Sequence, residues 1–136
     1  MVKLTATFPD LSKLVLRLSA GASFIFHGSQ KLFGAFGGSG IAGFTKYLGS
    51  LGIPYPEINA WLAAGTELFC GVALAIGFFA RLAAIPLIIV MGVAIFSVTG
   101  KNGFNIVNGG FEYNAVLIAV LLSIFLSGSG KYSVKD

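Results

Sequence analysis

The chain has 136 residues, of which 56% are hydrophobic and only 10% are charged, and its mean hydropathy is +0.89. Soluble domains carry about 25% charged residues, so this composition excludes an ordinary soluble domain and predicts a single integral membrane domain over residues 1–136. The net charge of +4 comes without a basic cluster interleaved with aromatics, which argues against nucleic-acid binding and favours contact with anionic lipid. The single cysteine excludes an intrachain disulfide and a cysteine-pair redox motif.

Four apolar stretches are long enough to predict membrane-spanning helices, at residues 11–33, 57–79, 82–98 and 111–126. Lys13 and Arg17 fall in the first two turns of the first span, where long basic side chains are expected to reach the membrane interface. The sequence therefore predicts an all-α fold, a polytopic four-helix bundle in a membrane.

Residues 41–51 are too short and too polar to cross a membrane. Phe44, Leu48 and Leu51 recur there at helical spacing, which predicts a short amphipathic helix lying flat on the membrane surface. An ordinary connecting loop is the alternative interpretation.

The basic residues predict the orientation of the bundle. In a chain with four spans, six basic residues share a side with the two termini: Lys3, Lys13, Arg17, Arg81, Lys131 and Lys135. The other three, Lys31, Lys46 and Lys101, fall on the opposite side. Because positive charge is retained in the cytoplasm, we expect a multi-pass protein of the cell membrane with both termini cytoplasmic.

Ionisable side chains inside apolar spans are costly and are therefore functional candidates. His27 and Lys31 lie one turn apart near the end of the first span, and Glu67 lies near the middle of the second. Glu112 begins the last span, close to the level of Lys31. We predict that these four side chains share the outer half of the bundle, with His27 and Glu67 as the catalytic residues.

Each of these residues also has a structural interpretation. His27 could simply hydrogen-bond a backbone carbonyl, and Glu67 could be a protonated structural carboxyl. Lys31 and Glu112 could form no more than a surface ion pair, which is the reading we favour for them.

Two aromatic residues complete the predicted ligand-binding set. Trp61 and Tyr113 are expected in an aromatic belt at the outer interface, beside the ionisable members His27, Lys31, Glu67 and Glu112. One histidine excludes bis-histidine haem, and the sequence holds no zinc spacing, iron–sulfur motif or nucleotide motif, so no metal site is predicted. The cofactor stays unknown, and a quinone remains a candidate because its carbonyls need a hydrogen-bond donor and a proton source in an apolar cleft.

The motifs of the chain, taken in order, resemble those of the DoxX family of small four-helix membrane proteins of bacteria and archaea. The resemblance runs from Leu16 nearly to the end and rests on His27-Gly28, Lys31-Leu32-Phe33-Gly34, Phe36-Gly37-Gly38, Leu51-Gly52-Ile53-Pro54, Glu67 with Gly71, Gly77 with Arg81-Leu82-Ala83-Ala84, Gly110 with Glu112-Tyr113, and Gly128-Ser129-Gly130-Lys131-Tyr132-Ser133-Val134. It implies a place in the plasma membrane of a prokaryote and a link to quinone-dependent sulfur oxidation or to oxidative-stress complexes.

Two hypotheses of function follow. The first is a quinone-interacting subunit of a membrane redox system, with residues 41–51 as a lid and a redox partner protein supplying electrons. The second is a non-enzymatic membrane module that scaffolds a partner protein, or that binds or moves a small apolar molecule. No complete catalytic motif decides between oxidoreductase subunit and binding module, and the sequence leaves a homo-oligomer open.

Overall fold

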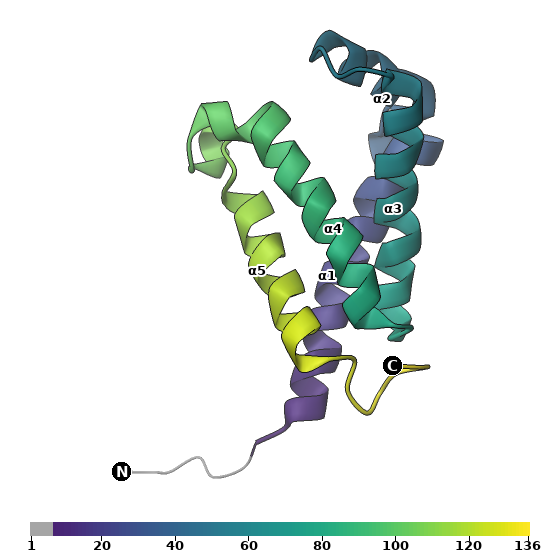
Figure 1. The fold of residues 1–136 in the computed structure, drawn as a ribbon, viewed down its shortest axis with the longest axis vertical. Helices are drawn as coiled ribbons and strands as arrows, with labels where there is room; N and C mark the ends of the chain where they lie inside the picture. Colours follow the sequence, from purple (N-terminus) through teal and green to yellow (C-terminus); the bar gives the residue numbers. More distant parts are fainter. Residues whose placement is uncertain (1–6) are drawn as a thin grey trace.

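The computed structural model describes residues 7–136, so Lys3, counted in the charge asymmetry, lies outside the described residues. The chain is helical throughout this range apart from short connections and one isolated bridge between Phe78 and Lys135. The elements in order are α1 (Pro9–Phe33), η1 (Ala35–Gly37), α2 (Gly40–Ser50), α3 (Pro56–Ile76), α4 (Ala80–Ala94), η2 (Ile95–Thr99), η3 (Gly100–Asn102), η4 (Ile106–Asn108) and α5 (Glu112–Ser127) (Figure 1).

The predicted all-α fold is confirmed, and the helices follow the predicted spans closely. Gly34 ends α1 and Gly77 ends α3, and both adopt a left-handed conformation that stops a helix. The second span was expected to continue to residue 79, but Gly77 ends it three residues earlier. The predicted short helix at residues 41–51 is present as α2, Gly40–Ser50, so the alternative of a plain loop is wrong.

The third span is longer than predicted and irregular at its end. α4 runs past Pro86 without a break and continues through η2, which is a π-helical turn, into η3. By length and composition, Pro56–Ile76 and the continuous stretch Ala80–Asn102 could each cross a membrane. α5 is equally apolar but shorter, with 16 residues.

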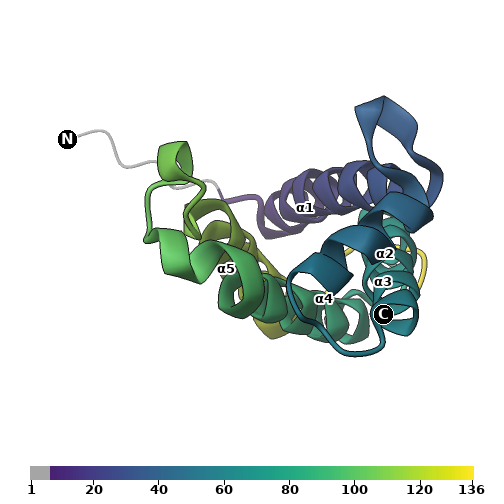
Figure 2. The same cartoon turned by 90° about the horizontal axis from the view of Figure 1, so that it is seen from above.

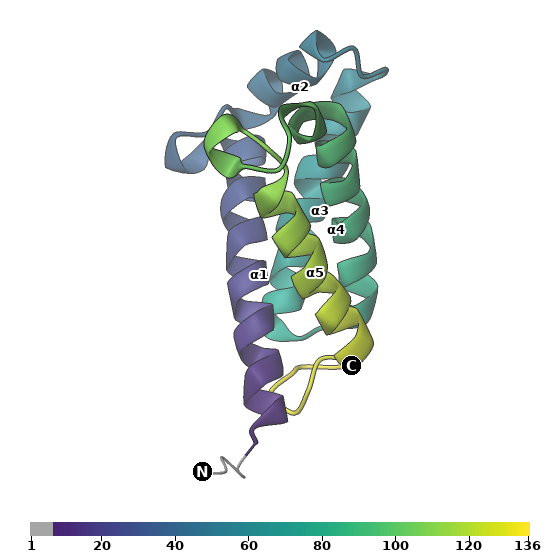
Figure 3. The same cartoon turned by 90° about the vertical axis from the view of Figure 1, so that its left-hand side faces the viewer.

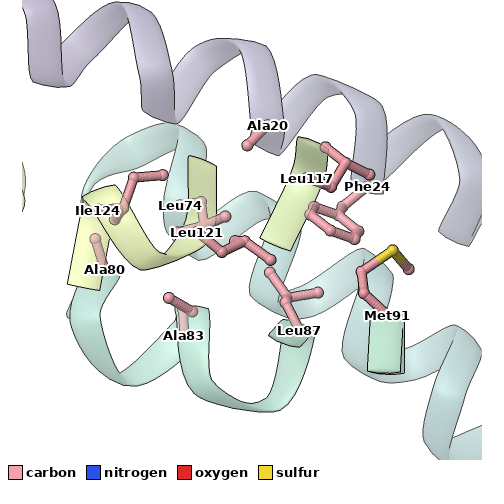
Figure 4. Close-up of a cluster of buried hydrophobic side chains, with 11 residues drawn as sticks. Ala20, Phe24, Leu74, Ala80, Ala83, Leu87, Met91, Leu117, Leu121 and Ile124 are labelled. Atoms are coloured by element: carbon pink, nitrogen blue, oxygen red, sulfur yellow. The ribbon is translucent and has the colours of Figure 1, made fainter. Parts of the chain in front are cut away.

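The helices form two pairs, α1 with α3 and α4 with α5 (Figures 1 and 3). The pairs meet at the end of the bundle that holds both termini. Toward the other end, α4 and α5 lean away from α3, and α2 lies across the top of α1 and α3 (Figure 2). The main core fills the end where the pairs meet, with residues from all four long helices (Figure 4): Ala20, Phe24, Leu74, Ala80, Ala83, Ala84, Leu87, Met91, Leu117, Leu121 and Ile124.

Glycines bring α1 and α3 into close contact. A Cβ at Gly28 would lie 2.7 Å from the backbone nitrogen of Leu68, and a Cβ at Gly71 would lie 2.9 Å from the Cβ of Phe24. No side chain larger than hydrogen fits at either position without a shift of the backbone. Small residues allow helices in a membrane to approach closely, and the backbones here pack directly on each other.

Arg17 does not reach the interface as expected. The residue is only 1% exposed, and its Nη2 donates a hydrogen bond to the carbonyl oxygen of Tyr132 at 2.6 Å. The chain after α5 folds back beneath the bundle and is held there by the amide of Phe79, which donates to the carbonyl oxygen of Lys135 at 2.7 Å. A side chain at Gly77 would collide with the guanidinium group, so the turn after α3 and the last residues together bury Arg17.

The contact between α1 and α3 predicts that two glycine-to-alanine substitutions differ in their effect on stability. Gly28→Ala should destabilise the bundle by roughly 1–3 kcal/mol, because its Cβ would press on the backbone of α3. Gly65→Ala in α3 is the matched control, since its Cβ meets nothing within 4 Å and alanine is the better helix former. Thermal unfolding in detergent measures both, and equal melting temperatures would contradict the tight contact.

Candidate functional site

A partly buried ion pair, in which the Lys31 side chain remains 29% exposed, joins α1 to α3. Glu67 lies in the middle of α3 and is 1% exposed, while Lys31 lies in the last turn of α1. The Nζ of Lys31 donates to Oε1 of Glu67 at 2.5 Å. The favoured surface pairing of Lys31 with Glu112 is therefore wrong, since the lysine turns inward to the carboxylate of α3.

The surroundings of the pair strengthen the attraction between its charges. The Nζ of Lys31 lies 5.4 Å from the centre of the Phe44 ring, so α2 covers the ammonium group with an aromatic face. Low-dielectric surroundings increase the Coulomb attraction between the two groups. Oε2 of Glu67 is buried and has no hydrogen-bond partner among the described residues. The pair therefore retains one acceptor oxygen that the protein itself does not use.

A cavity of about 440 Å³ lies beside this pair. Its wall is formed by α2, α3, α4 and η2, and it lies on the side where α4 leans away from α3 (Figure 1). Lys31 and Glu67 both line it, and most other lining residues are apolar. Phe44, Tyr47 and Leu48 of α2 form the wall nearest the end of the bundle. The volume falls within the range of cavities that hold small organic ligands.

His27 does not line this cavity, although it lies one turn before Lys31 on α1. Its ring lies 5.9 Å from the ring of Tyr113 in α5, centre to centre, and its Nδ1 lies 3.0 Å from Oε1 of Gln30. The Gln30 amide in turn donates through Nε2 to the carbonyl oxygen of Phe36. Because an amide oxygen can only accept, this contact uses a proton on His27 Nδ1, and Nε2 is the ring nitrogen left for another partner.

The remaining predicted ligand-binding residues do not line the cavity. Glu112 begins α5, and its Oε1 accepts a hydrogen bond from the amide of Ile106 at 3.2 Å, which ties the preceding loop to the helix. Trp61 is 53% exposed on the outer side of α3, in keeping with a residue of the aromatic belt. Of the six predicted residues, the structure brings Lys31 and Glu67 together at the cavity, and His27 and Tyr113 together at the junction of α1 and α5.

Polar residues of η2 and α5 were not among the predicted site residues. Thr99 lines the cavity and donates to Oδ1 of Asn114 at 3.0 Å, and Asn114 is 9% exposed in the core of α5. An amide inside an apolar span was a signal that could have been followed. Within residues 7–136, no group of three or more His, Cys, Asp and Glu side chains is arranged to hold a metal ion.

The Lys31–Glu67 pair predicts how the free energy of unfolding changes in three variants. Lys31→Met should cost about 3 kcal/mol, because it leaves the Glu67 carboxylate buried without its partner. The double variant Lys31→Met with Glu67→Gln should recover at least half of that loss, because the uncompensated charge is removed. Lys46→Met, at an exposed lysine of α2, is the matched control. Chemical denaturation in detergent measures all three, and a double variant no more stable than Lys31→Met would contradict the pairing.

The chain is similar to known membrane proteins. The family model described as DoxX matches residues 12–100. A Bacillus subtilis protein named "Putative oxidoreductase CatD" is 28% identical over 120 residues, 88% of this chain and 81% of that protein. "Inner membrane protein YphA" of Escherichia coli is 28% identical over 128 residues, 89% of this chain and 86% of its own length.

A third relative is similar over a shorter stretch. A Haemophilus influenzae protein described as uncharacterized is 31% identical over 78 residues, 57% of this chain, and the match spans only 52% of that protein. No solved structure matches the chain significantly. The family match covers more than half of the chain, and together with the apolar helices and the inner-membrane relative it shows that this membrane protein belongs to the DoxX family.

Proposed function

We propose that this protein is a quinone-binding subunit of a membrane redox system, and that the quinone head group binds in the cavity beside Lys31 and Glu67. The observation that carries the proposal is a mostly apolar cavity with an ammonium–carboxylate pair on its wall. A lipid-soluble carbonyl compound needs such a combination. The apolar wall takes up the ring and tail, and the ammonium group offers a donor to the carbonyl oxygen.

The chemistry assigned to the two residues is the movement of protons. A quinone takes up two electrons and two protons when it becomes a quinol, and each proton goes to a carbonyl oxygen. Lys31 orients one carbonyl, and Glu67 exchanges a proton with the site through its carboxyl group. The electrons come from a redox partner protein, and redox chemistry agrees with the name "Putative oxidoreductase CatD" of a similar protein.

α2 serves as a lid over this site. Phe44, Tyr47 and Leu48 line the cavity, and the ring of Phe44 also lies against the ammonium group of Lys31. A head group that binds Lys31 must therefore contact α2 as well. The lid excludes water from the pair, which strengthens its electrostatic interaction with a bound carbonyl.

His27 has a separate role in this proposal. It lies one helical turn from Lys31 on α1, and Nε2 is the ring nitrogen left for another partner. We assign to it the exchange of protons between the membrane surface and the Lys31–Glu67 pair. Tyr113 packs against the imidazole and fixes its position.

The second candidate is a non-enzymatic module that binds or moves a small apolar molecule. The mostly apolar lining of the cavity favours it, because such a wall would also accept a ligand without redox chemistry. The two candidates differ in what the purified protein should contain. A co-purifying quinone supports the redox subunit, whereas another apolar compound, or a retained partner protein without a quinone, supports the module.

The ligand experiment uses purified protein in detergent. A decyl-tailed naphthoquinone should bind to the wild type, and Glu67→Gln should weaken binding about tenfold because the carboxylate that positions Lys31 is lost. Glu57→Gln, at an exposed glutamate in the first turn of α3, should leave the Kd unchanged. Quenching of Trp61 fluorescence follows binding, and mass spectrometry of extracted lipids identifies the native ligand.

His27→Ala completes this experiment. The residue does not line the cavity, so the Kd should stay within twofold of the wild type, while proton uptake on dithionite reduction of bound quinone should slow. Normal quinone binding by Glu67→Gln, together with a lowered melting temperature, would show that the pair is structural only.

We also propose that all four long helices cross the plasma membrane and that both termini are cytoplasmic. The greater number of basic residues at the end of the bundle that holds the termini supports this orientation. In a Cys70→Ser background, Ser39→Cys should react with an impermeant maleimide on intact cells, and Lys131→Cys only after permeabilisation. Both positions are exposed, so burial does not complicate the comparison. Equal labelling from outside would refute the topology.

A further inference from the structure

The cavity is lined by polar residues of a second segment besides the ion pair. The π-helical turn η2 contributes Ser97 and Thr99 to its lining, whereas Lys31 and Glu67 belong to α1 and α3. Figure 1 shows this end of α4 lying apart from α3, with α2 at the same level. π-Helical turns in α-helices occur frequently at functional sites, because they change which side chains face a given direction.

The hydroxyl of Thr99 is already occupied by the protein. It donates to Oδ1 of Asn114 at 3.0 Å, and the Asn114 amide lies 3.5 Å from the sulfur of Met91. This chain of contacts attaches the π-helical turn to α5 and fixes its position. The proton of Thr99 is therefore used within the protein, and its oxygen remains only as an acceptor.

The hydroxyl of Ser97 differs in this respect. Helical serine and threonine side chains often donate to the carbonyl four residues earlier, as Ser19 does to Val15 and Thr45 does to Ile41, both at 2.8 Å. Ser97 makes no such bond in the part of the chain that the structure describes. The wider turn of η2 changes the position of the carbonyls below it. Ser97 thus presents an unused donor on the wall of a mostly apolar cavity.

We propose that Ser97 is a second anchor for the ligand, and that the site selects head groups with hydrogen-bond acceptors at two opposite ends. Lys31 donates to one carbonyl oxygen and Ser97 to the other. This inference rests on the proposed quinone site and makes it specific for para-quinones. A ligand with one polar end, such as a simple ketone bound to Lys31, leaves the Ser97 hydroxyl without a partner in the filled cavity, and that loss reduces its affinity.

The test compares two bicyclic ligands that differ at the second carbonyl and in the saturation of the ring that carries it. A decyl-tailed naphthoquinone carries both, and the matched decyl-tailed tetralone carries one. We expect Ser97→Ala to raise the Kd of the naphthoquinone roughly threefold to tenfold, the value of one hydrogen bond. The Kd of the tetralone should stay within twofold. Ser97→Thr keeps the hydroxyl and should bind the naphthoquinone like the wild type.

Ser19→Ala is the control, because that exposed hydroxyl bonds only to its own helix. Equal effects of Ser97→Ala on both ligands, or equal affinity of the wild type for both, would overturn the inference and leave the quinone site standing. Failure of the wild type to bind the naphthoquinone at all would overturn the proposed function, and the second anchor with it.

Discussion

The direct contact of α1 with α3 determines where the charged residues of this protein lie. Gly28 packs on the backbone of Leu68, which fixes both the distance between the two helices and their relative register. Lys31 follows Gly28 by one turn, and Glu67 directly precedes Leu68. The register set by the glycine therefore brings the ammonium group to the carboxylate at 2.5 Å. A larger residue at position 28 would move α1 outward and separate the two charges.

The cavity follows from a second constraint, the uneven contact between the two helix pairs. The core residues of α4 and α5, such as Leu87 and Leu121, meet α1 and α3 at the end that holds the termini (Figure 4). Farther along, α4 leans away, and α2 covers the space with Phe44 and Leu48. The ion pair lies at the border between the packed and the open half. Both charged residues thus line the space that a ligand could enter.

Much of the fold could be predicted because it depends on local patterns, whereas the site depends on contacts between helices. Apolar runs and the stop at Gly34 identify the helices without knowledge of their neighbours. The choice of Glu67 over Glu112 as partner of Lys31 depends on the register of α1 against α3. The burial of Arg17 depends on a segment more than one hundred residues away in sequence, as its bond to Tyr132 shows. Neither of these two contacts can be predicted from a periodic pattern in the sequence.

The energetics of the ion pair favour a functional over a structural interpretation. A buried pair contributes little net stability, since desolvation of both charges offsets most of their attraction, and apolar residues of similar volume would serve equally well. The helices α1 and α3 are in any case held by backbone contact at Gly28 and Gly71. A pair that is not needed to join these helices, that lies on a cavity wall and that keeps one carboxylate oxygen unpartnered is better explained by what enters the cavity. In the proposed quinone site this pair would act on a bound carbonyl without rearrangement, because preorganised charge need not reorganise when the ligand's charge changes.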